Sequence, residues 1–494
     1  MTRILPFSNA NLQTIHQTLL GFAPDAVLIG GAVRDLLLDR PVHDLDYVVE
    51  GDGLLVGRKL ADALGAAYYP LDESRKIARV VWKPEEETLV VDISSLIGMT
   101  LEEDIRRRDF TINAMAMLPD GRLFDLLGGA EDLKQRVLRL CSPDSLHNDP
   151  VRTIRAVRFL YLFDLTPEPG LDQLMWYASP RLTSVSPERQ RDEFIKALAL
   201  PHPHLVVDRL VDWRIADALM PELVALQDVE QPAPHVFDVY RHTLQTLRWM
   251  ARLDAWILND ARAQDVQEAQ IHQRLNAHRS HLRQYLQKPL TAERPRWLWL
   301  RFAAIAHDWG KPRAFRENED GGIQFYKHEQ LSGEMAADWM GRYHCGKSEI
   351  SFVKRICTEH MRPMGMFITQ SLPSRRALFR FYRDVGDAAP AAILLFLADF
   401  LGARGRTISE QELATALDFT DAFLKPLDES RTASPIPVPL LDGHDLIRLF
   451  GLQPGPHIGH LLSALQEAQA AGEVETQEQA IGYIETMLKK ESYD

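Results

Sequence analysis

The chain has 494 residues, 46% apolar and 25% charged, a composition that fits a folded, multidomain protein and excludes fibrous and wholly disordered ones. Its 56 basic and 69 acidic residues give a formal net charge of −13, so the protein as a whole is not a basic coat for nucleic acid, although a local basic surface could still bind RNA. Its three cysteines form no CxxC pair, which argues against a zinc ribbon and a disulfide framework and predicts a reducing compartment.

We expect neither a signal peptide nor a membrane span. The N-terminal residues contain no charged head followed by an apolar run, which a secretory signal requires. The longest apolar run, Ala388–Ala398, ends at Asp399 and falls well short of the roughly 18–20 residues of a membrane helix. These features predict a cytoplasmic protein with no membrane partner.

Residues 26–100 alternate short apolar runs with turn signals, which is typical of an α/β fold. The predicted elements, in chain order, are a strand over Ala26–Ile29, a helix over Ala32–Leu38, and strands over Leu45–Val49, Val80–Trp82 and Leu89–Ile93. We therefore predict an α/β head that ends near residue 146.

Two glycines, Gly30 and Gly31, lie between the first predicted strand and the helix. Glycines in this position let backbone N–H groups approach a phosphate, and the N-terminus of a helix favours an anion. A glycine pair is also common in ordinary turns, so the pattern alone leaves both interpretations open.

Asp44 and Asp46 are separated by one residue in the second predicted strand, so their side chains share one face. Two neighbouring carboxylates repel each other unless a cation lies between them. The apolar neighbours Leu45 and Tyr47 predict a partly buried strand, where paired carboxylates commonly hold a divalent metal, and oxygen ligands favour Mg²⁺. Asp92, in a later predicted strand, is a candidate third carboxylate. A solvated strand edge is the alternative.

From about residue 147 the apolar residues recur at a helical period, beginning with Val151, Ile154 and Val157, and strand signals nearly disappear. Two turn-rich stretches, Gln231–Pro234 and Ser430–Pro439, divide this helical part. The predicted domains are therefore residues 1–146, 147–230, 231–430 and 431–494.

Four segments carry a resemblance to a known family. They are Leu28–Asp52 (LIGGAVRDLLLDRPVHDLDYVVEGD), Arg106–Met117 (RRRDFTINAMAM), Leu123–Leu133 (LFDLLGGAEDL) and Asn148–Phe159 (NDPVRTIRAVRF). In order and spacing they resemble the motifs of the class II tRNA nucleotidyltransferase and bacterial poly(A) polymerase superfamily. The resemblance implies a polymerase-β-like α/β nucleotidyltransferase head followed by an all-α body.

The resemblance implies nucleotide transfer from CTP or ATP to the 3′-hydroxyl of an RNA. Asp44 and Asp46 would then hold two Mg²⁺ ions, with Asp92 as the third candidate carboxylate. The residues that the resemblance places around the nucleotide are Gly30, Gly31, Arg34, Arg108, Asp109 and Asn113. For Asp109 and Asn113, a purely structural role is the alternative.

Asp149 and Arg152 are three residues apart on the helix that begins the second predicted domain, so they share one face. A carboxylate and a guanidinium together present acceptors and donors that can match the Watson–Crick edge of a base. The resemblance implies that this pair recognises C and A and that Arg155 and Arg158 extend towards the nucleotide. A solvated helix face is the alternative. The family's motif begins with Glu where this chain has Asn148.

The segment Tyr69–Val81 lies between the first two motifs, where the family carries a flexible loop involved in the switch from C to A addition. Its presence favours an enzyme that can add the terminal A. A plain β-hairpin is the alternative for the same residues.

A second group of residues lies in the third predicted domain, where AAIAHDWGKP contains a His-Asp pair. In chain order the group resembles the HD phosphohydrolase superfamily, and its members are His242, His307, Asp308, His328, His360 and Asp399. The resemblance implies a site for a divalent transition metal or Mg²⁺ and a bound water that attacks phosphorus. A degenerate, purely structural HD domain is the alternative.

Residues 251–296 look like an insertion within this domain, and residues 241–316 around them contain 14 basic and only 6 acidic residues. This charge balance suggests a basic helical face against tRNA, with a solvated helical hairpin as the alternative. The tail, 431–494, is a possible further tRNA contact.

The combined expectation is an enzyme that adds CCA to tRNA 3′ ends and carries a second, phosphohydrolase site. Its expected partners are tRNA, CTP and ATP, with Mg²⁺ in the head. A bacterial poly(A) polymerase and a CC-only or A-only tRNA nucleotidyltransferase are alternatives with the same chemistry. An HD phosphohydrolase whose head only docks RNA is the alternative from a different class.

Overall fold

A computed structural model describes residues 4–5, 7, 9–96, 100–291, 294–369, 372–429 and 438–491, without the side chains of Arg406, Asp428, Glu429 and Glu491. The chain folds into two compact units, which are described separately. The first consists of residues 1–197 and 209–219, and the second of residues 198–208 and 220–494.

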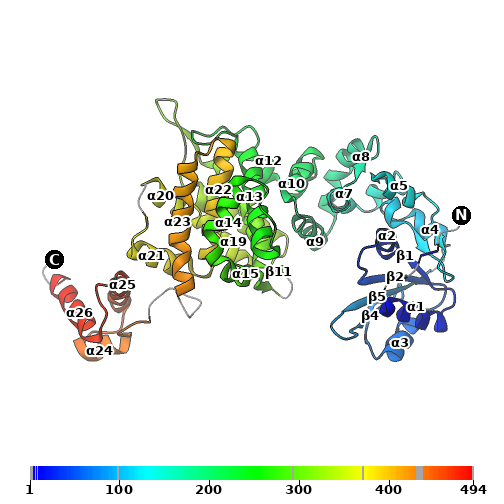
Figure 1. The fold of residues 1–494 in the computed structure, drawn as a ribbon, viewed down its shortest axis with the longest axis horizontal. Coiled ribbons are helices and arrows are strands. Elements are labelled where there is room, and N and C mark those ends of the chain that lie inside the picture. Colours follow the sequence, from blue (N-terminus) through cyan, green and yellow to red (C-terminus); the bar gives the residue numbers. More distant parts are fainter. Residues whose placement is uncertain are drawn as a thin grey trace. The chain divides into compact units, whose positions relative to one another are not determined.

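The first unit contains a seven-stranded mixed sheet with strand order β3-β4-β5-β2-β1-β6-β7 (Figure 1). Its strands are β1 (Val27–Ile29), β2 (Asp44–Val49), β3 (Ala67–Asp72), β4 (Ile77–Trp82), β5 (Leu89–Ser95), β6 (Ala116–Met117) and β7 (Leu123–Phe124). The central pair β2–β5 is parallel and the other pairs are antiparallel. The predicted α/β head is confirmed, with strand ends within a few residues of those expected.

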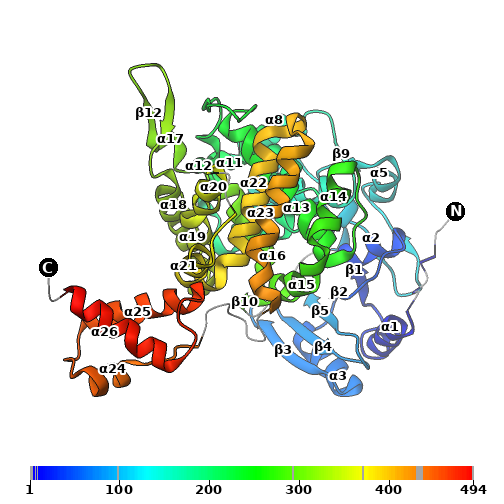
Figure 2. The same cartoon turned by 60° about the vertical axis from the view of Figure 1, so that its left-hand side comes forward.

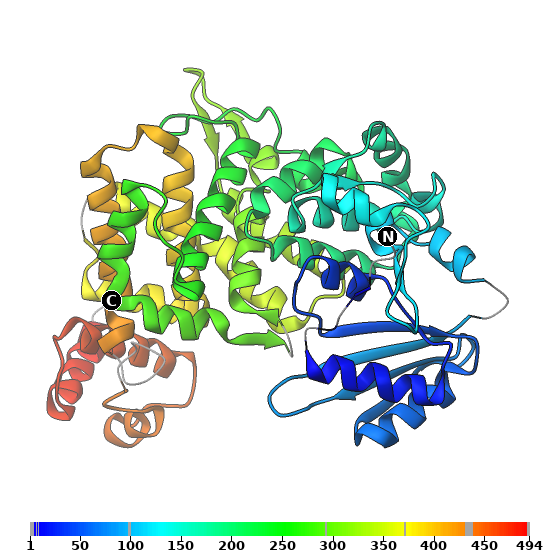
Figure 3. The same ribbon diagram turned by 45° about the vertical axis from the view of Figure 1, so that its right-hand side comes forward.

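Helices α1 (Ala10–Phe22) and α3 (Gly53–Leu64) pack together against one face of the sheet (Figure 3). Asp52 caps α3 by accepting from two backbone N–H groups, and Gly57 lies so close to Ala78 that any side chain there would clash. The short helix α2 (Gly31–Leu37) follows β1 directly. The segment Tyr69–Val81 forms the hairpin β3–β4, which is the alternative considered from the sequence.

The rest of the first unit is mainly helical, as expected after the head. Its elements are α4 (Leu101–Arg106), η1 (Thr111–Asn113), α5 (Gly129–Gln135), α6 (Ser145–Asn148), α7 (Arg152–Leu162), α8 (Leu171–Ala178), η2 (Ser179–Ser184) and α11 (Ile215–Leu219), with the short pair β8 (Val137–Leu138) and β9 (Thr166–Pro167). Helices α9 (Pro187–Leu198) and α10 (Pro203–Asp212) include the residues at which the chain passes between the units. The apolar face predicted from Val151, Ile154 and Val157 is buried.

The second unit is built around the apolar helix α22, whose residues 389–403 are all buried. In Figure 2, α13, α22 and α23 run side by side. The helices before the tail are α12 (Pro221–Val224), α13 (Val239–Asn259), α14 (Val266–Leu275), α15 (Arg279–Gln287), α16 (Arg296–Ala306), α17 (Lys311–Ala314), α18 (His328–Arg342), α19 (Lys347–Glu359), α20 (Met361–Ile368), α21 (Arg375–Val385), α22 (Ala389–Arg404) and α23 (Glu410–Glu429); the 3-10 turns are η3 (Asn276–His278), η4 (Gly386–Ala388) and η5 (Gly405–Thr407). The stretch 375–404 is long and apolar enough to cross a membrane, but 89% of its most apolar window is buried, as in the core helix of a globular protein.

The expectation of an all-α body is wrong in detail, because two small hairpins interrupt the second unit. They are β10 (Pro289–Thr291) with β11 (Arg294–Pro295), and β12 (Phe315–Glu317) with β13 (Ile323–Phe325). Strands of two or three residues are too short to produce an alternating pattern in the sequence. The second hairpin lies beside a cavity, since residues of β13 line the one described below.

The tail consists of α24 (Gly443–Phe450), α25 (Pro456–Ala471) and α26 (Gln477–Glu491), which share a small apolar core. Helix α25 packs against α21 (Figure 2). Arg380 and Arg383 on α21 both form ion pairs with Glu467 on α25.

The basic residues of the 251–296 stretch are largely neutralised within the unit. Arg274 pairs with Asp418 and Asp421, and both Arg279 and Arg283 pair with Asp260. These contacts reduce the free positive charge of the stretch, and a contact between this stretch and tRNA stays a prediction.

Candidate functional sites

Strand β2 presents Asp44 and Asp46 together on one face, as the alternation of a strand requires. Both side chains are exposed, whereas Leu45 and Tyr47 between and beside them are buried. The strand is therefore half-buried as predicted, but its carboxylates face the open side. Asp92 is the direct neighbour of Asp46 across the parallel β2–β5 pair.

The carboxylates of the head repel one another. Partial loss of hydration raises the pKa of Asp46 above its ordinary value; the charge of Arg108 opposes this rise, and the charges of Asp92 and Asp44 add to it. Arg79 forms two hydrogen bonds of 2.8 Å with Asp92, so this carboxylate already has a cation. Asp44 and Asp46 therefore fit a divalent cation by charge and donor type, and Asp92 would have to release Arg79 to join them.

Gly30 makes the turn between β1 and α2, with φ +77° and ψ −135°. A Cβ on Gly30 would lie 3.0 Å from Nη1 of Arg108 and 3.8 Å from a carboxylate oxygen of Asp46. The glycine turn, Arg108 and Asp46 therefore surround one small space. Arg108 is held by a 3.0 Å ion pair with Asp104, and the first turn of α2 begins at Gly31.

Arg34 is buried and already has partners within the protein. It pairs with Asp35 at 2.9 Å, its guanidinium lies 4.4 Å from the centroid of the Phe163 ring, and it donates a hydrogen bond to Asn113. Asn113 in turn donates to Asp109 at 3.1 Å. Arg34 and Asn113 thus belong to a buried network that supports the turn after β1.

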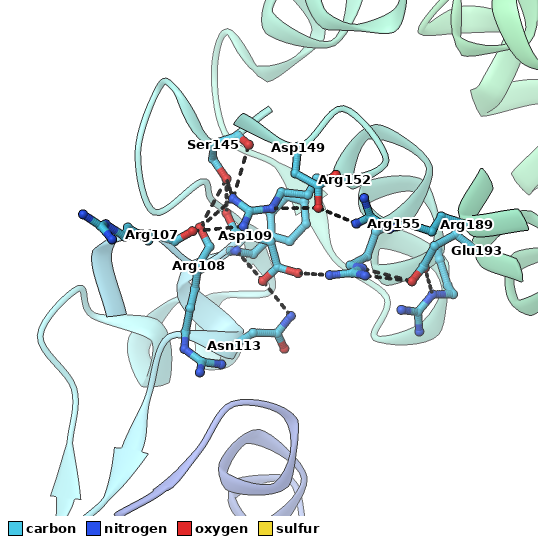
Figure 4. Close-up of polar contacts among 12 residues, drawn as sticks. Arg107, Arg108, Asp109, Asn113, Ser145, Asp149, Arg152, Arg155, Arg189 and Glu193 are labelled. Carbon is cyan, nitrogen blue, oxygen red and sulfur yellow. Dashed lines mark hydrogen bonds and ion pairs between the residues drawn. The ribbon is translucent and has the colours of Figure 1, made fainter. Parts of the chain in front are cut away.

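Asp109 is the centre of that network (Figure 4). It accepts from the backbone N–H of Phe110 at 2.8 Å and from Arg155 at 3.1 Å. Burial acts to raise the pKa of Asp109, but Arg155, Asn113 and the backbone donor together hold it below its ordinary value.

Arg155 on α7 contacts Glu193 on α9 at 2.9 Å (Figure 4), and Arg158, also on α7, contacts the same carboxylate at 3.0 Å. The structure therefore places these two arginines between helices, where they join α7 to α9 and, through Asp109, to the head. Glu193 was not a candidate from the sequence. The only signal was a carboxylate on a helix rich in charge, which carries no information about its partner.

Arg152 lies near Asp149, with 3.9 Å between their closest atoms, but each has other partners. Arg152 donates to the hydroxyl of Ser145 at 2.7 Å and to the backbone carbonyls of Arg107 and Arg108 at 3.0 and 3.2 Å (Figure 4). Asp149 accepts from Arg189 at 2.7 Å. The pair is thus assembled beside the second motif, with most of its hydrogen bonds made inside the protein, although Nε of Arg152 is buried without a hydrogen-bond partner in the described part of the chain.

In the second unit, six side chains from helices and from the turns at helix ends converge: His242, His307, Asp308, His328, His360 and Asp399. We call them the six-residue cluster. They form two groups of three whose donor atoms lie within 4.8 Å of one another, namely His242, His307 and Asp399, and Asp308, His328 and His360. All six are buried.

Asp308 stands between the two groups. Its Oδ2 lies 3.2 Å from Nε2 of His307 and 3.5 Å from Nε2 of His242. Its Oδ1 lies 3.3 Å from Nε2 of His328 and 3.9 Å from Nε2 of His360. One carboxylate therefore faces two separate pairs of imidazoles.

The imidazoles are oriented by backbone carbonyls. Nδ1 of His307, His328 and His360 hydrogen-bonds to the carbonyl three residues earlier, at 3.0, 2.9 and 2.6 Å. With Nδ1 used in this way, Nε2 is the nitrogen left to bind a cation, either a proton or a metal ion. The Nε2 atoms of all four histidines are buried and, within the described part of the chain, none has a hydrogen-bond partner of good geometry. Buried polar atoms that face one another in this way form a group that could hold a metal ion.

The electrostatics agree with this interpretation. The pKa values of Asp308 and Asp399 are held well below their ordinary range by the histidines, and by Lys311 in the case of Asp308, despite burial. Burial lowers the pKa of His307, but the two carboxylates outweigh it and raise the pKa to about 10. In the absence of metal, a proton thus neutralises part of the cluster. Imidazole nitrogens and carboxylate oxygens suit a divalent transition metal better than Ca²⁺.

A cavity of about 1040 Å³ opens beside the cluster, and Asp308, His328, His360 and Asp399 form part of its wall. Lys311 also lines it and lies 2.8 Å from Asp308. Sequence reasoning missed Lys311 and His235, another lining residue, although Lys311 follows the His-Asp pair by only three positions. The ring of His235 lies 5.0 Å from that of His242.

The mixed sheet, the glycine turn and the paired aspartates define a nucleotidyltransferase head, and comparisons with known proteins agree. The model of the Poly A polymerase head domain matches residues 26–139, and the "Probable RNA and SrmB- binding site of polymerase A" matches residues 164–226. The model of tRNA nucleotidyltransferase domain 2 matches residues 436–484.

Two full-length relatives make the assignment specific. The A-adding tRNA nucleotidyltransferase of Deinococcus radiodurans is 33% identical over 94% of this chain and 96% of its own. The CC-adding tRNA nucleotidyltransferase of Thermus thermophilus is 31% identical over 93% of both chains. This chain therefore belongs to the tRNA nucleotidyltransferase family.

Solved structures share the fold. The Thermotoga maritima CCA-adding enzyme, in complex with tRNA, aligns over 99% of both chains with a TM-score of 0.61 and 20% identity. A CCA-adding enzyme in complex with CTP aligns over 97% of this chain and 96% of its own, with a TM-score of 0.65 and 20% identity. At this identity the likeness concerns the fold alone.

Proposed function

We propose that this protein adds nucleotides of the CCA sequence to the 3′ end of tRNA, using CTP and ATP. The observation that supports this is the pair Asp44 and Asp46 on β2, beside the turn at Gly30 and the guanidinium of Arg108. The chain also resembles a tRNA nucleotidyltransferase over 94% of its length. The relatives named above add either A or CC. The expected product is the complete CCA end, and a divided activity is the alternative that the assay must separate.

Each residue of the head has a physical task in this proposal. Asp44 and Asp46 would hold Mg²⁺ ions, which supply charge to activate the 3′-hydroxyl and to stabilise the departing pyrophosphate. Gly30 leaves room for the triphosphate, and Arg108 provides a positive charge at its edge. Asp149 and Arg152 would exchange their internal hydrogen bonds for the edge of C or A.

The test is extension of a tRNA transcript that ends at the discriminator base, with CTP alone, ATP alone and both, resolved at single nucleotides. A tRNA that already ends in CC is tested alongside. Two Cs from CTP and a final A with both nucleotides support complete CCA addition. Extension that stops at CC, or A added only to tRNA-CC, shows a divided enzyme, and a long ladder from ATP alone shows a poly(A) polymerase. Asp46→Ala should abolish extension, while Glu50→Gln, an exposed carboxylate just after β2, should not.

We further propose that the second unit hydrolyses phosphoesters at the six-residue cluster. The observation that supports this proposal is the set of buried histidine Nε2 atoms in the cluster. They face Asp308 and Asp399, and in the described part of the chain they have no hydrogen-bond partners of good geometry. His242, His307, Asp308 and Asp399 would hold one divalent ion, and Asp308, His328 and His360 a second.

A bound ion supplies an acidic water and neutralises phosphoryl oxygens. In the reaction, the water oxygen forms a bond to phosphorus, the ester P–O bond breaks, and the leaving oxygen takes a proton. Lys311, at 2.8 Å from Asp308, places a positive charge where the phosphoryl group would lie. The test is hydrolysis of 4-nitrophenyl phosphate with Mn²⁺, Ni²⁺ or Mg²⁺. Asp308→Ala should abolish it and leave tRNA extension intact, whereas Asp46→Ala should do the reverse.

A further inference from the structure

The cavity beside the six-residue cluster contains a second positive group, Arg404, that the proposed hydrolysis does not use. Arg404 lies five residues beyond Asp399 on α22, and both residues line the cavity. At a rise of about 1.5 Å per residue, the two positions are about 7.5 Å apart along the helix. The cavity therefore has one polar end at the cluster and another at Arg404.

The positive charge of Arg404 is only weakly balanced by other groups of the protein. Its side chain is only 15% exposed, and its Nε is buried without a hydrogen-bond partner in the described part of the chain. The closest carboxylate oxygen that pairs with it belongs to Glu412, at 3.6 Å. Glu412 is about half exposed and its other oxygen accepts from the backbone N–H and hydroxyl of Ser409. At 3.6 Å the pair is longer than a hydrogen bond, and solvent screens the half-exposed Glu412, so this carboxylate balances the charge of Arg404 only weakly.

The guanidinium of Arg404 is nevertheless fixed in place. Its central carbon lies 4.1 Å from the centroid of the Phe400 ring, a cation–π contact that holds the group against the cavity wall. Loss of hydration lowers the pKa of Arg404, which reflects the cost of keeping this charge inside. A partly buried cation whose Nε has no hydrogen-bond partner in the described part of the chain is a ready partner for an anionic group of a ligand.

The wall between the two polar ends is apolar. It is formed by α20 and α22 together with β13, and its apolar residues include Met361, Met364, Phe367, Ile368, Phe400 and Ala403. Flat or apolar groups pack well against methionine and phenylalanine side chains. The matching ligand has a phosphate at one end, an apolar middle and a second anionic group at the other end.

We propose that this cavity selects phosphoesters that carry a second anionic group, held by Arg404 while the phosphate lies at the six-residue cluster. The inference rests on the proposed hydrolysis at that cluster and assigns its substrate class. Arg404 acts in binding and specificity, at the end of the substrate remote from the phosphorus atom.

A matched pair of unreactive ligands tests the proposal directly. In (4-carboxybenzyl)phosphonate and (4-nitrobenzyl)phosphonate, a methylene replaces the ester oxygen, and the carboxylate and nitro groups have the same shape but different charge. Binding of each to the manganese-loaded, full-length protein is measured by calorimetry. We expect the wild type to bind the carboxylate ligand about tenfold more tightly, the effect of one charge-assisted hydrogen bond.

Two variants locate the effect. Arg404→Gln should bind both ligands with the weaker affinity of the nitro compound, while its manganese content stays unchanged. Glu412→Gln, which removes the competing carboxylate, should keep or increase the preference. Equal affinities in the wild type, an unchanged preference in Arg404→Gln, or binding of neither phosphonate by the metal-loaded protein would overturn the proposal.

Failure of the underlying function gives a different result. A wild type that holds no metal and does not hydrolyse 4-nitrophenyl phosphate refutes the proposed hydrolysis, and this inference with it. A wild type that hydrolyses 4-nitrophenyl phosphate but shows no preference for the carboxylate ligand refutes this inference alone.

Discussion

Oδ1 of Asp308 lies 3.3 Å from Nε2 of His328, on the opposite side of the carboxylate from His307, whose Nε2 lies 3.2 Å from Oδ2. A single ion would need only one oxygen of Asp308 and the histidine next to that oxygen. The use of both oxygens argues for two ion positions that share Asp308 as a bridge.

The number of bound metal ions per chain tests this arrangement. We expect the wild type, dialysed against Mn²⁺, to hold two ions, and His328→Ala to hold one, because it removes a ligand of only one position. Asp308→Ala should lose both, since it also leaves the opposing imidazoles without their shared carboxylate. Elemental analysis measures the content, with His444→Ala on the exposed face of α24 as the control. A wild type with a single ion, or His328→Ala with two, contradicts the bridge.

The turn at Gly30 gives a second prediction. In Gly30→Ala, the new Cβ would lie 3.0 Å from Arg108 and would strain a backbone with φ +77°. We expect a loss of about 1–3 kcal/mol of stability from the strain, together with a KM for CTP and ATP that rises about tenfold, a change of about 1.4 kcal/mol in binding. Nucleotide incorporation into tRNA measures the second effect.

Gly65→Ala is the matched control for this experiment. Gly65 also has positive φ, at +63°, but a Cβ there meets no atom within 4 Å. It should lower stability without changing KM. If both variants raise KM equally, the effect of Gly30 is general strain and the space beside Arg108 has no special role.

The buried pair Asp109–Arg155 predicts how acid affects the first unit. Because the folded-state pKa of Asp109 is lowered, the unfolded chain binds its proton first as the pH falls. The stability that this carboxylate contributes is complete above its unfolded pKa of about 4 and is lost as the pH falls through the folded value. Hydrogen exchange of α7, followed from pH 7 to pH 3, reports the loss.

Asp109→Asn should remove about 3 kcal/mol at neutral pH, the cost of leaving Arg155 with less compensation in a buried site. It should also flatten the acid dependence of exchange in α7, with Asp217→Asn on an exposed position as the control. An acid profile as steep as that of the wild type would show that other carboxylates, such as Glu193, dominate.

Local patterns predicted the head well, because they depend on neighbouring residues. The alternation in β2 places Asp44 and Asp46 on one face, and the glycines after β1 form the expected turn. The exposure of these carboxylates was not predictable, since it depends on which face of the sheet the helices cover. The same holds for the ion pair of Asp92 with Arg79, which requires the β4–β5 register.

The arginines of α7 show the limit of such reasoning. Their spacing and type suggested contact with a nucleotide, but Arg155 and Arg158 meet Glu193, a residue more than thirty positions away. In the second unit, the order of histidines and aspartates predicted which six residues converge. It contained no information on Arg404, whose importance depends on the cavity wall formed by α20 and α22.

The arginines of the 251–296 stretch provide the last prediction. Arg279 donates to the carbonyl of Trp256 at 2.7 Å, and Arg283 to that of Ile257 at 2.7 Å, so both bind carbonyls in the last turn of α13. Such carbonyls lack partners within the helix and favour a positive charge. Arg283→Glu should therefore lower stability by about 1–2 kcal/mol without changing the salt dependence of tRNA binding. Arg262→Glu, on the same stretch, should leave stability nearly unchanged. Thermal unfolding measures the stability, and tRNA titrations at several salt concentrations measure the salt dependence of binding. If the slope of log affinity against log salt concentration falls by about one in Arg283→Glu, the RNA-binding interpretation is restored.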